Sequence, residues 1–109
     1  GPLEVSLPDA KDTNSGGTVL TGSFPNPFNP STRIDARVGG QDGQVIRLVI
    51  YNIRGQRIRT IDETRLSPGR HQWLWNGCDD RGRPCTAGVY LCRLESGARV
   101  STLRLTKLP

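Results

Sequence analysis

The feature that most constrains the fold is the stretch from Trp73 to Leu94, which has the pattern of two strands joined by turn residues. In the runs HQWLW (71–75) and VYLCRL (89–94), every second residue lies on the same face of an extended strand, so each run has one bulky face to bury. Asn, Asp, Gly and Pro residues between the runs favour turns. Both tryptophans of the chain lie in this stretch, which predicts that the core forms around it.

The rest of the chain repeats this pattern, with turn residues between short apolar runs. We predict strands at 32–38, 45–53, 56–61 and 99–108, with a short first strand near Val19 and Leu20. Phe24 and Phe28, in a proline-rich segment, are predicted to anchor onto the core, and the uneven apolar spacing of 99–108 predicts a bulge or a bend. No segment has a helical period. The prediction is an all-β fold, an antiparallel β-sandwich of six or seven short strands.

The length of 109 residues suits one domain. We interpret residues 1–4, GPLE, as a tag and cloning scar, residues 5–20 as a linker, and residues 21–109 as the β-sandwich. No apolar run is long enough for a transmembrane segment, and no signal peptide is recognised.

The net charge of +5 comes mostly from arginines that are spread singly along the chain. An attraction to nucleic acid is one interpretation, and a solvated sheet face is the other. The best basic cluster is formed by Arg54, Arg57 and Arg59, but no aromatic residue is interleaved with it for base stacking. The sequence therefore favours the solvated face and no nucleic-acid partner.

The chain has three cysteines, which could form a disulfide or remain reduced. Cys78 and Cys85 flank the turn segment, so a disulfide between them would close a short loop and would indicate an oxidising compartment. The alternative is three reduced thiols, with Cys92 buried as a small apolar side chain. The sequence favours the disulfide.

Catalytic and metal-binding patterns are lacking. His71 is the only histidine and lies in phase with Trp73 and Trp75, which places it at the edge of a core, and the cysteine spacing is not that of a zinc motif. Asp79 and Asp80 do not fit a calcium loop and are better explained as turn residues. We expect no enzyme activity, no metal and no cofactor.

Aromatic residues offer one binding alternative. Trp73, Trp75 and Tyr90 could stack on a cell-surface glycan if at least two of them were exposed on one surface. The chain has only six aromatic residues, and the core needs most of them.

A series of short motifs resembles a known family. They are FPNPFNPSTRI (24–34), LVIYNIRG (48–55), LSPG (66–69), WNG (75–77), GRP (82–84), GVY (88–90) and a closing Lys107. Their order and spacing resemble the type A C-terminal sorting domain of the type IX secretion system, and also the related immunoglobulin-like domain of the flagellar hook-capping protein.

This resemblance implies an immunoglobulin-like β-sandwich of about seven strands at the C-terminus of an exported multidomain bacterial protein. It implies a passage through the periplasm to the cell surface or medium, with the outer-membrane secretion machinery and the N-terminal cargo domains as partners. The family landmarks fall on these residues: Pro25, Asn26, Pro27, Gly88, Tyr90 and Lys107. Two functions stay open, an export and attachment signal, or an accessory adhesion, glycan-binding or spacer module.

Overall fold

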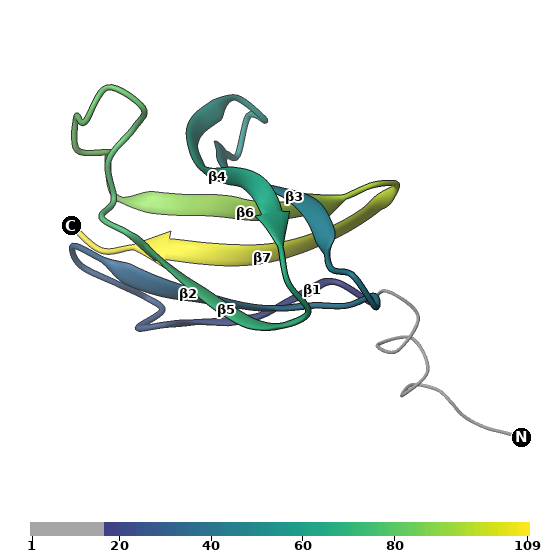
Figure 1. Ribbon diagram of the computed structural model, residues 1–109. Helices are drawn as coiled ribbons and strands as arrows, with labels where there is room; N and C mark the ends of the chain where they lie inside the picture. The colour runs from purple at the N-terminus through teal and green to yellow at the C-terminus, as the bar shows by residue number, and fades with distance from the viewer. Residues whose placement is uncertain (1–16) are drawn as a thin grey trace, which may run out of the picture.

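The computed structural model describes residues 17–109, which form seven strands in two facing antiparallel sheets (Figure 1). The strands are β1 (Val19–Phe24), β2 (Thr32–Val38), β3 (Gln44–Asn52), β4 (Arg57–Leu66), β5 (Gly69–Trp75), β6 (Gly88–Ser96) and β7 (Arg99–Lys107). One sheet has the order β1-β2-β5 and the other β4-β3-β6-β7, and the described residues contain no helix. The predicted all-β sandwich is confirmed. Residues 1–16, which include the predicted tag and most of the predicted linker, lie outside the described part.

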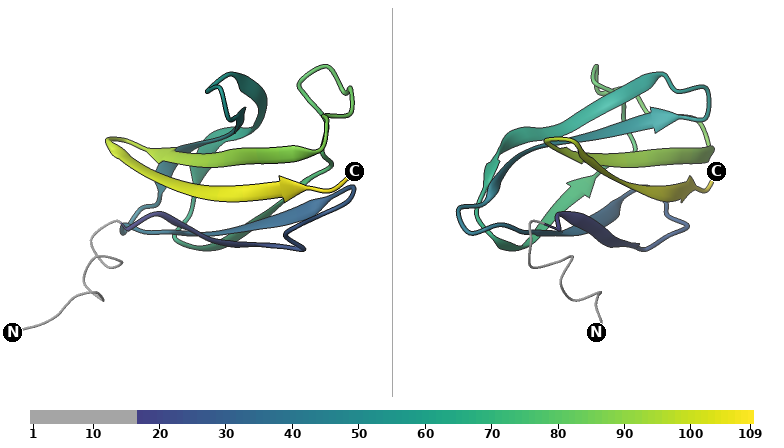
Figure 2. Two further views of the ribbon diagram at one scale, coloured as in Figure 1. Left: turned by 180° about the vertical axis from the view of Figure 1, so that it is seen from behind. Right: turned by 90° about the vertical axis from the view of Figure 1, so that its right-hand side faces the viewer.

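The two sheets form separate layers, and β5 and β6 belong to different layers (Figure 2). The turn-rich residues 76–87 therefore carry the chain from one sheet to the other. This connection, the segment between β1 and β2, and the end of β7 lie at the same end of the sandwich, whereas β1 begins at the opposite end (Figures 1 and 2).

Alternating residues of the strands fill the space between the sheets. The predicted inward residues of β2 and β3 are buried, among them Ile34 and Ile50, each with none of its surface exposed. Trp75 is also fully buried and lies between the rings of Phe28 and Tyr90, with centroids 5.4 and 5.5 Å away. Its indole Nε1 donates a hydrogen bond of 2.9 Å to the Cys78 carbonyl, so the polar end of the ring is satisfied.

Of the predictions about apolar residues, the anchoring of Phe24 is wrong, and so is the bulge that was one of the two alternatives for residues 99–108. Phe24 does not anchor onto the core, because it ends β1 on the outer face of the sheet and is 68% exposed. β7 has no bulge, since its pairing with β6 runs without a shift from Gly88 opposite Lys107 to Ser96 opposite Arg99. Its uneven apolar spacing arises because Val100 and Leu108 are exposed rather than buried.

The predicted disulfide between Cys78 and Cys85 is not formed, and all three cysteines are free thiols. An isolated antiparallel bridge pairs Cys78 with Pro84, and the Cys85 N–H donates to the Gly77 carbonyl at 2.8 Å. Directly paired residues share a face of a ladder and their neighbours point to the other face. Cys85 therefore packs against the core while Cys78 lies on the opposite side of the two-stranded bridge.

Among residues 17–109 there is no helix that could span a membrane.

Candidate functional site

The residues that the family resemblance selected come from distant parts of the chain, and most of them meet at one end of the sandwich. Pro25, Asn26 and Pro27 belong to the segment between β1 and β2, which runs along the outer edge of β7. On the other side of β7, Gly88 lies opposite Lys107. We call residues 25–30, PNPFNP, the clamp segment.

Asn26 pairs with β7 through its side chain as a strand would through its backbone. Its Nδ2 donates to the Arg104 carbonyl at 2.8 Å, and its Oδ1 accepts from the Thr106 N–H at 3.0 Å. A carboxamide carries the same donor and acceptor as a peptide group, so one side chain satisfies two backbone groups on the edge of the sheet. Pro25 and Pro27, on either side of it, are exposed.

Phe28 continues this pairing with its backbone. Its N–H donates to the Thr106 carbonyl at 2.9 Å, and its carbonyl accepts from the Leu108 N–H at 2.8 Å, which makes a parallel bridge around Lys107. Its ring is 1% exposed and packs against Trp75. The clamp segment thus closes the outer edge of β7 over its last residues, and an open edge could otherwise accept a strand of another chain.

Thr32 holds the beginning of the clamp segment. Its side chain is fully buried, and its Oγ1 donates to the Pro25 carbonyl at 2.7 Å. Sequence reasoning missed this role of Thr32, as well as the edge-pairing role of Asn26. A polar residue in the inward phase of a strand was the available signal for Thr32.

Replacing Asn26 by alanine is expected to lower the free energy of unfolding by about 1–3 kcal/mol, because two hydrogen bonds of about 0.5–1.5 kcal/mol each are lost. Urea unfolding measures this loss. Hydrogen exchange should show faster exchange of the Thr106 amide in this variant. The control is Asn29→Ala, since within residues 17–109 the Asn29 side chain donates only to the Pro109 carbonyl, at 3.1 Å. Unchanged protection of Thr106 in Asn26→Ala would contradict the pairing.

Lys107 lies on the same face of β7 as the buried Leu105, so its side chain crosses the end of the core. A Cβ atom at Gly77 would lie 2.9 Å from its Cε, so the aliphatic part of the lysine rests directly on this glycine. The ammonium is near enough to Cys85 to act on the pKa of that thiol. Within residues 17–109, Lys107 forms no ion pair.

Tyr90 and Cys85 form the inner wall beside Lys107. The Tyr90 hydroxyl donates to the Thr86 carbonyl at 2.6 Å, which secures the turn before β6. Burial raises the pKa of the Cys85 thiol above its ordinary value of 9.0, and nearby Asp79 and Cys78 raise it further. Lys107 acts in the opposite direction but does not cancel the rise in this pKa, so the Cys85 thiol ionises less readily than an exposed cysteine.

Burial raises the pKa of the Cys92 thiol to about 12. The unfolded chain loses this proton from about pH 9, whereas the folded chain keeps it, so the free energy of unfolding should fall as the pH rises from about 9 to 12. The slope from this thiol is about 1.4 kcal/mol per pH unit. Urea unfolding at pH 8 and pH 10, under reducing conditions, measures the fall. Cys92→Ala is the control and should lose this part of the slope; an identical slope in both proteins would contradict the assignment.

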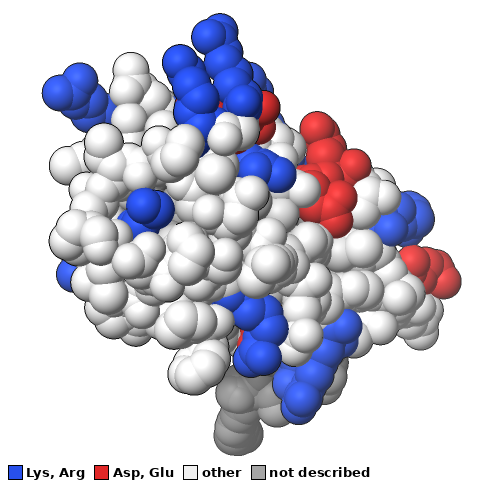
Figure 3. All heavy atoms as spheres, turned by 90° about the vertical axis from the view of Figure 1, so that its left-hand side faces the viewer, with Lys and Arg blue, Asp and Glu red and all other residues white. Residues whose placement is uncertain are grey.

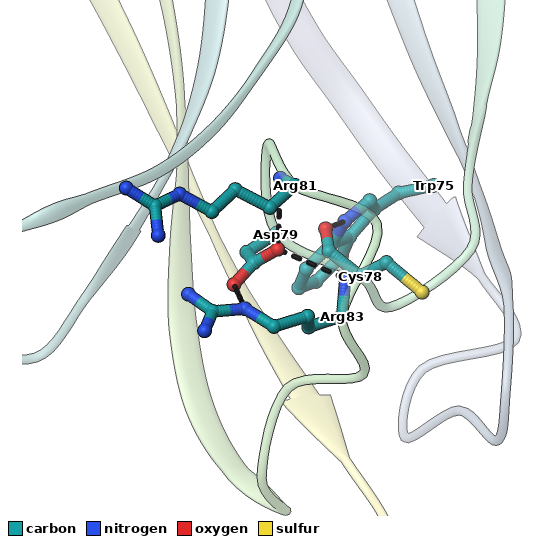
Figure 4. A network of polar contacts seen from close by, with 5 residues as sticks. All are labelled: Trp75, Cys78, Asp79, Arg81 and Arg83. Carbon is teal, nitrogen blue, oxygen red and sulfur yellow. Dashed lines mark hydrogen bonds and ion pairs between the residues drawn. The ribbon is translucent and has the colours of Figure 1, made fainter.

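The connection between β5 and β6 closes the other edge of the four-stranded sheet, and Figure 4 shows the contacts of Asp79 within this connection. Asp79 accepts hydrogen bonds from the backbone N–H groups of Arg83 and Arg81 and from the Arg83 side chain, which together lower the pKa of its carboxyl. The loop that results places Asp80 on β4, where its N–H donates to the Ile58 carbonyl at 2.9 Å and its Oδ1 accepts from the Thr60 N–H at 3.0 Å. Asp79 therefore acts as a turn residue, as predicted, whereas the pairing of Asp80 with the edge of β4 was not predicted.

The aromatic residues do not form a sugar-stacking platform. Trp75 is fully buried and Tyr90 is 5% exposed, so two of the three rings are unavailable for a flat ligand. Trp73 is half-buried, and its Nε1 donates to Asp62 Oδ2 at 2.8 Å, which joins β5 to β4. His71 stacks on Trp73 and lies at the edge of the core, as predicted.

Basic side chains gather over the loops at the top of the face shown in Figure 3. Two arginines of the predicted basic cluster contact the connection between β5 and β6, since Arg57 pairs with Asp80 at 3.7 Å and Arg59 donates to Asn76 Oδ1 at 3.4 Å. The basic cluster of Arg54, Arg57 and Arg59 is thus partly engaged with its own loops. Among the described residues, no group of three or more His, Cys, Asp or Glu side chains could hold a metal ion.

The comparison with family models decides the family. Residues 36–100, more than half of the chain, match the model of the FlgD Ig-like domain. This chain belongs to the FlgD Ig-like domain family. The match covers β3 to β6 entirely and leaves out the clamp segment and most of β7. A search of curated proteins found no match.

Solved structures share the fold of this FlgD Ig-like domain at low identity. They include dimeric latent PorU from Porphyromonas gingivalis (TM-score 0.72, 14% identity, 86% of this chain) and FlgD from P. aeruginosa (TM-score 0.55, 13% identity, 82% of this chain). PorZ, a surface component of the type IX secretion system of Porphyromonas gingivalis, matches over 83% of this chain (TM-score 0.52, 17% identity). The chain spans 9% of PorU, 64% of FlgD and 11% of PorZ, so the likeness is that of one domain.

Proposed function

We propose that this domain is a non-catalytic C-terminal β-sandwich that directs the export and surface attachment of a secreted multidomain bacterial protein, as a type IX sorting domain of the type A class does. The observation that carries the proposal is the clamped end of β7. Asn26 and Phe28 hold this end through four backbone hydrogen-bonding groups on three residues, and Lys107 lies beside them with no ion pair among residues 17–109.

The arrangement of the ends also supports this function. The chain enters β1 at one end of the sandwich, and β7, whose last residue is Lys107, ends at the other (Figure 2). Cargo domains joined before β1 would leave the clamped end free for the outer-membrane secretion machinery. The presence of a similar sandwich in PorZ, from the same secretion system, agrees with an exported protein.

The alternative is an accessory Ig-like module for adhesion or spacing in a cell-surface protein. One observation favours it: clamp and loop contacts cover β7 and β4, the two outer strands of the four-stranded sheet, which suits a unit that must not pair with its neighbours. Glycan binding by stacked aromatic rings is not supported for this module, because the rings of Trp75 and Tyr90 are buried.

An export assay separates the two functions. Residues 17–109, which retain all seven strands, are fused behind a periplasmic reporter in a bacterium with a type IX machine. The proposal expects the reporter at the surface or in the medium, and retention of a reporter without the domain. A folded fusion that stays in the periplasm would refute the export function and leave the accessory module.

A further inference from the structure

Two arginines face each other directly on the outer side of the three-stranded sheet. Arg37 of β2 is the register partner of Arg70 of β5, and both are exposed. Like charges opposite each other on neighbouring strands are destabilising. No other strand pairing in residues 17–109 places two like charges directly opposite each other.

The structure offers no compensation for this pair. Neither Arg37 nor Arg70 forms a hydrogen bond or an ion pair within the described range 17–109. The other sheet is different, since Arg47 lies opposite Glu63 and forms an ion pair with Glu95 at 3.6 Å. The three-stranded sheet thus carries two facing arginines without a negative partner in residues 17–109, whereas the facing charges of the four-stranded sheet are opposite in sign. This difference suggests that a ligand supplies the negative charge to the two arginines.

A hollow lies beside the two guanidinium groups. Its volume is about 290 Å³, and its polar walls include Thr21, Asp35 and Gln72 as well as Arg37 and Arg70. The Asp35 carboxylate is already held by Arg33, with hydrogen bonds of 2.9 and 3.1 Å, so it does not neutralise the pair. The hollow is therefore a positively charged depression with hydroxyl and amide groups at its side. Basic side chains also appear at the lower edge of Figure 3, on the side of the three-stranded sheet.

We propose that Arg37 and Arg70 bind an oxyanion, the phosphate or sulfate group of a small ligand whose remaining part lies in this hollow. Each guanidinium can donate two parallel hydrogen bonds to such a group, and a doubly charged anion would remove the repulsion between the arginines. Thr21 and Gln72 can bind hydroxyl groups of the attached ligand. This site lies on the outer face of the three-stranded sheet and does not depend on the export function.

The test is a titration of the folded chain with inorganic phosphate, sulfate and glycerol phosphate at constant ionic strength, followed by NMR of the arginine Nε–Hε signals. Saturable shifts of Arg37 and Arg70 are expected. Arg37→Gln and Arg70→Gln should each weaken binding by about tenfold or more. Arg99→Gln is the matched control, since Arg99 is also exposed and without an ion pair in residues 17–109, and it should bind as the unaltered chain does.

The arms of the titration separate the sources of the anion. Tighter binding of glycerol phosphate than of inorganic phosphate would assign the hollow to an esterified ligand, and tighter binding of inorganic phosphate would assign the site to a free ion. Without any anion, Arg70→Gln should raise the melting temperature at low salt more than Arg99→Gln does. Equal affinity in all variants, or linear shifts of every arginine, would overturn the site. Binding of an aspartate-rich peptide without binding of phosphate or sulfate would also overturn it.

Discussion

Replacing Trp75 by alanine is expected to lower the free energy of unfolding by about 3–5 kcal/mol. The side chain is fully buried, it contacts the rings of Phe28 and Tyr90, and its Nε1 hydrogen bond to Cys78 ties β5 to the next connection. The cavity would open where the clamp segment meets the core, and a small domain cannot readily collapse around it. Urea unfolding, followed by circular dichroism, measures the loss.

Trp73→Ala is the matched control for this prediction. Trp73 belongs to the same strand and is also a tryptophan, but it is only half-buried and its hydrogen bond to Asp62 lies at the edge of the sandwich. Its removal should cost clearly less than that of Trp75. Equal losses in both variants would show that Trp75 is not the centre of the core.

Gly77→Ala should lower the free energy of unfolding by about 2–5 kcal/mol, which combines about 1–2 kcal/mol for a left-handed backbone with about 1–3 kcal/mol for overpacking. Gly77 has a φ of 76°, and a Cβ atom there would lie 2.7 Å from the Pro30 carbonyl oxygen and 2.9 Å from Lys107 Cε. Because the Pro30 carbonyl belongs to the backbone of the clamp segment, the added methyl group must displace the clamp segment.

Gly55→Ala separates backbone strain from the clash. Gly55 has a similar φ of 82°, but no heavy atom would lie within 4 Å of its Cβ. This variant should lose only the backbone part, about 1–2 kcal/mol. If the two variants were equally stable in urea, the contact of Gly77 with the clamp segment and Lys107 would be wrong.

Local patterns in the sequence predicted the strands well. The alternation in 32–38 matches β2 at both ends, and the turn at 52–55 forms with the Gly55 N–H donating to the Asn52 carbonyl at 3.0 Å. These features depend on residues close in the chain, such as side-chain period and turn chemistry. The inward positions of Trp75 and Tyr90 followed from the same alternation.

Contacts between distant segments could not be predicted in this way. The pairing of Asn26 with Arg104 and Thr106 joins residues about 80 positions apart, and nothing local marks an asparagine as an edge partner. The sequence around Phe24 resembles that around Phe28, so the local pattern does not distinguish them, although Phe28 packs against Trp75 and Phe24 is exposed. The prediction of a disulfide is wrong because it rested on the short loop between Cys78 and Cys85. Loop length does not show on which face of the two-stranded bridge each cysteine lies.

The most direct test of the proposed function is the secreted fraction of the reporter fusion carrying Lys107→Gln, compared with Arg99→Gln. Both changes remove one positive charge from β7 and preserve its length, and urea unfolding should find both variants folded. If the export machinery binds the clamped end of β7, Lys107→Gln should abolish secretion of the reporter, whereas Arg99→Gln should leave the secreted fraction unchanged. Equal export of the two variants would contradict the role given to Lys107.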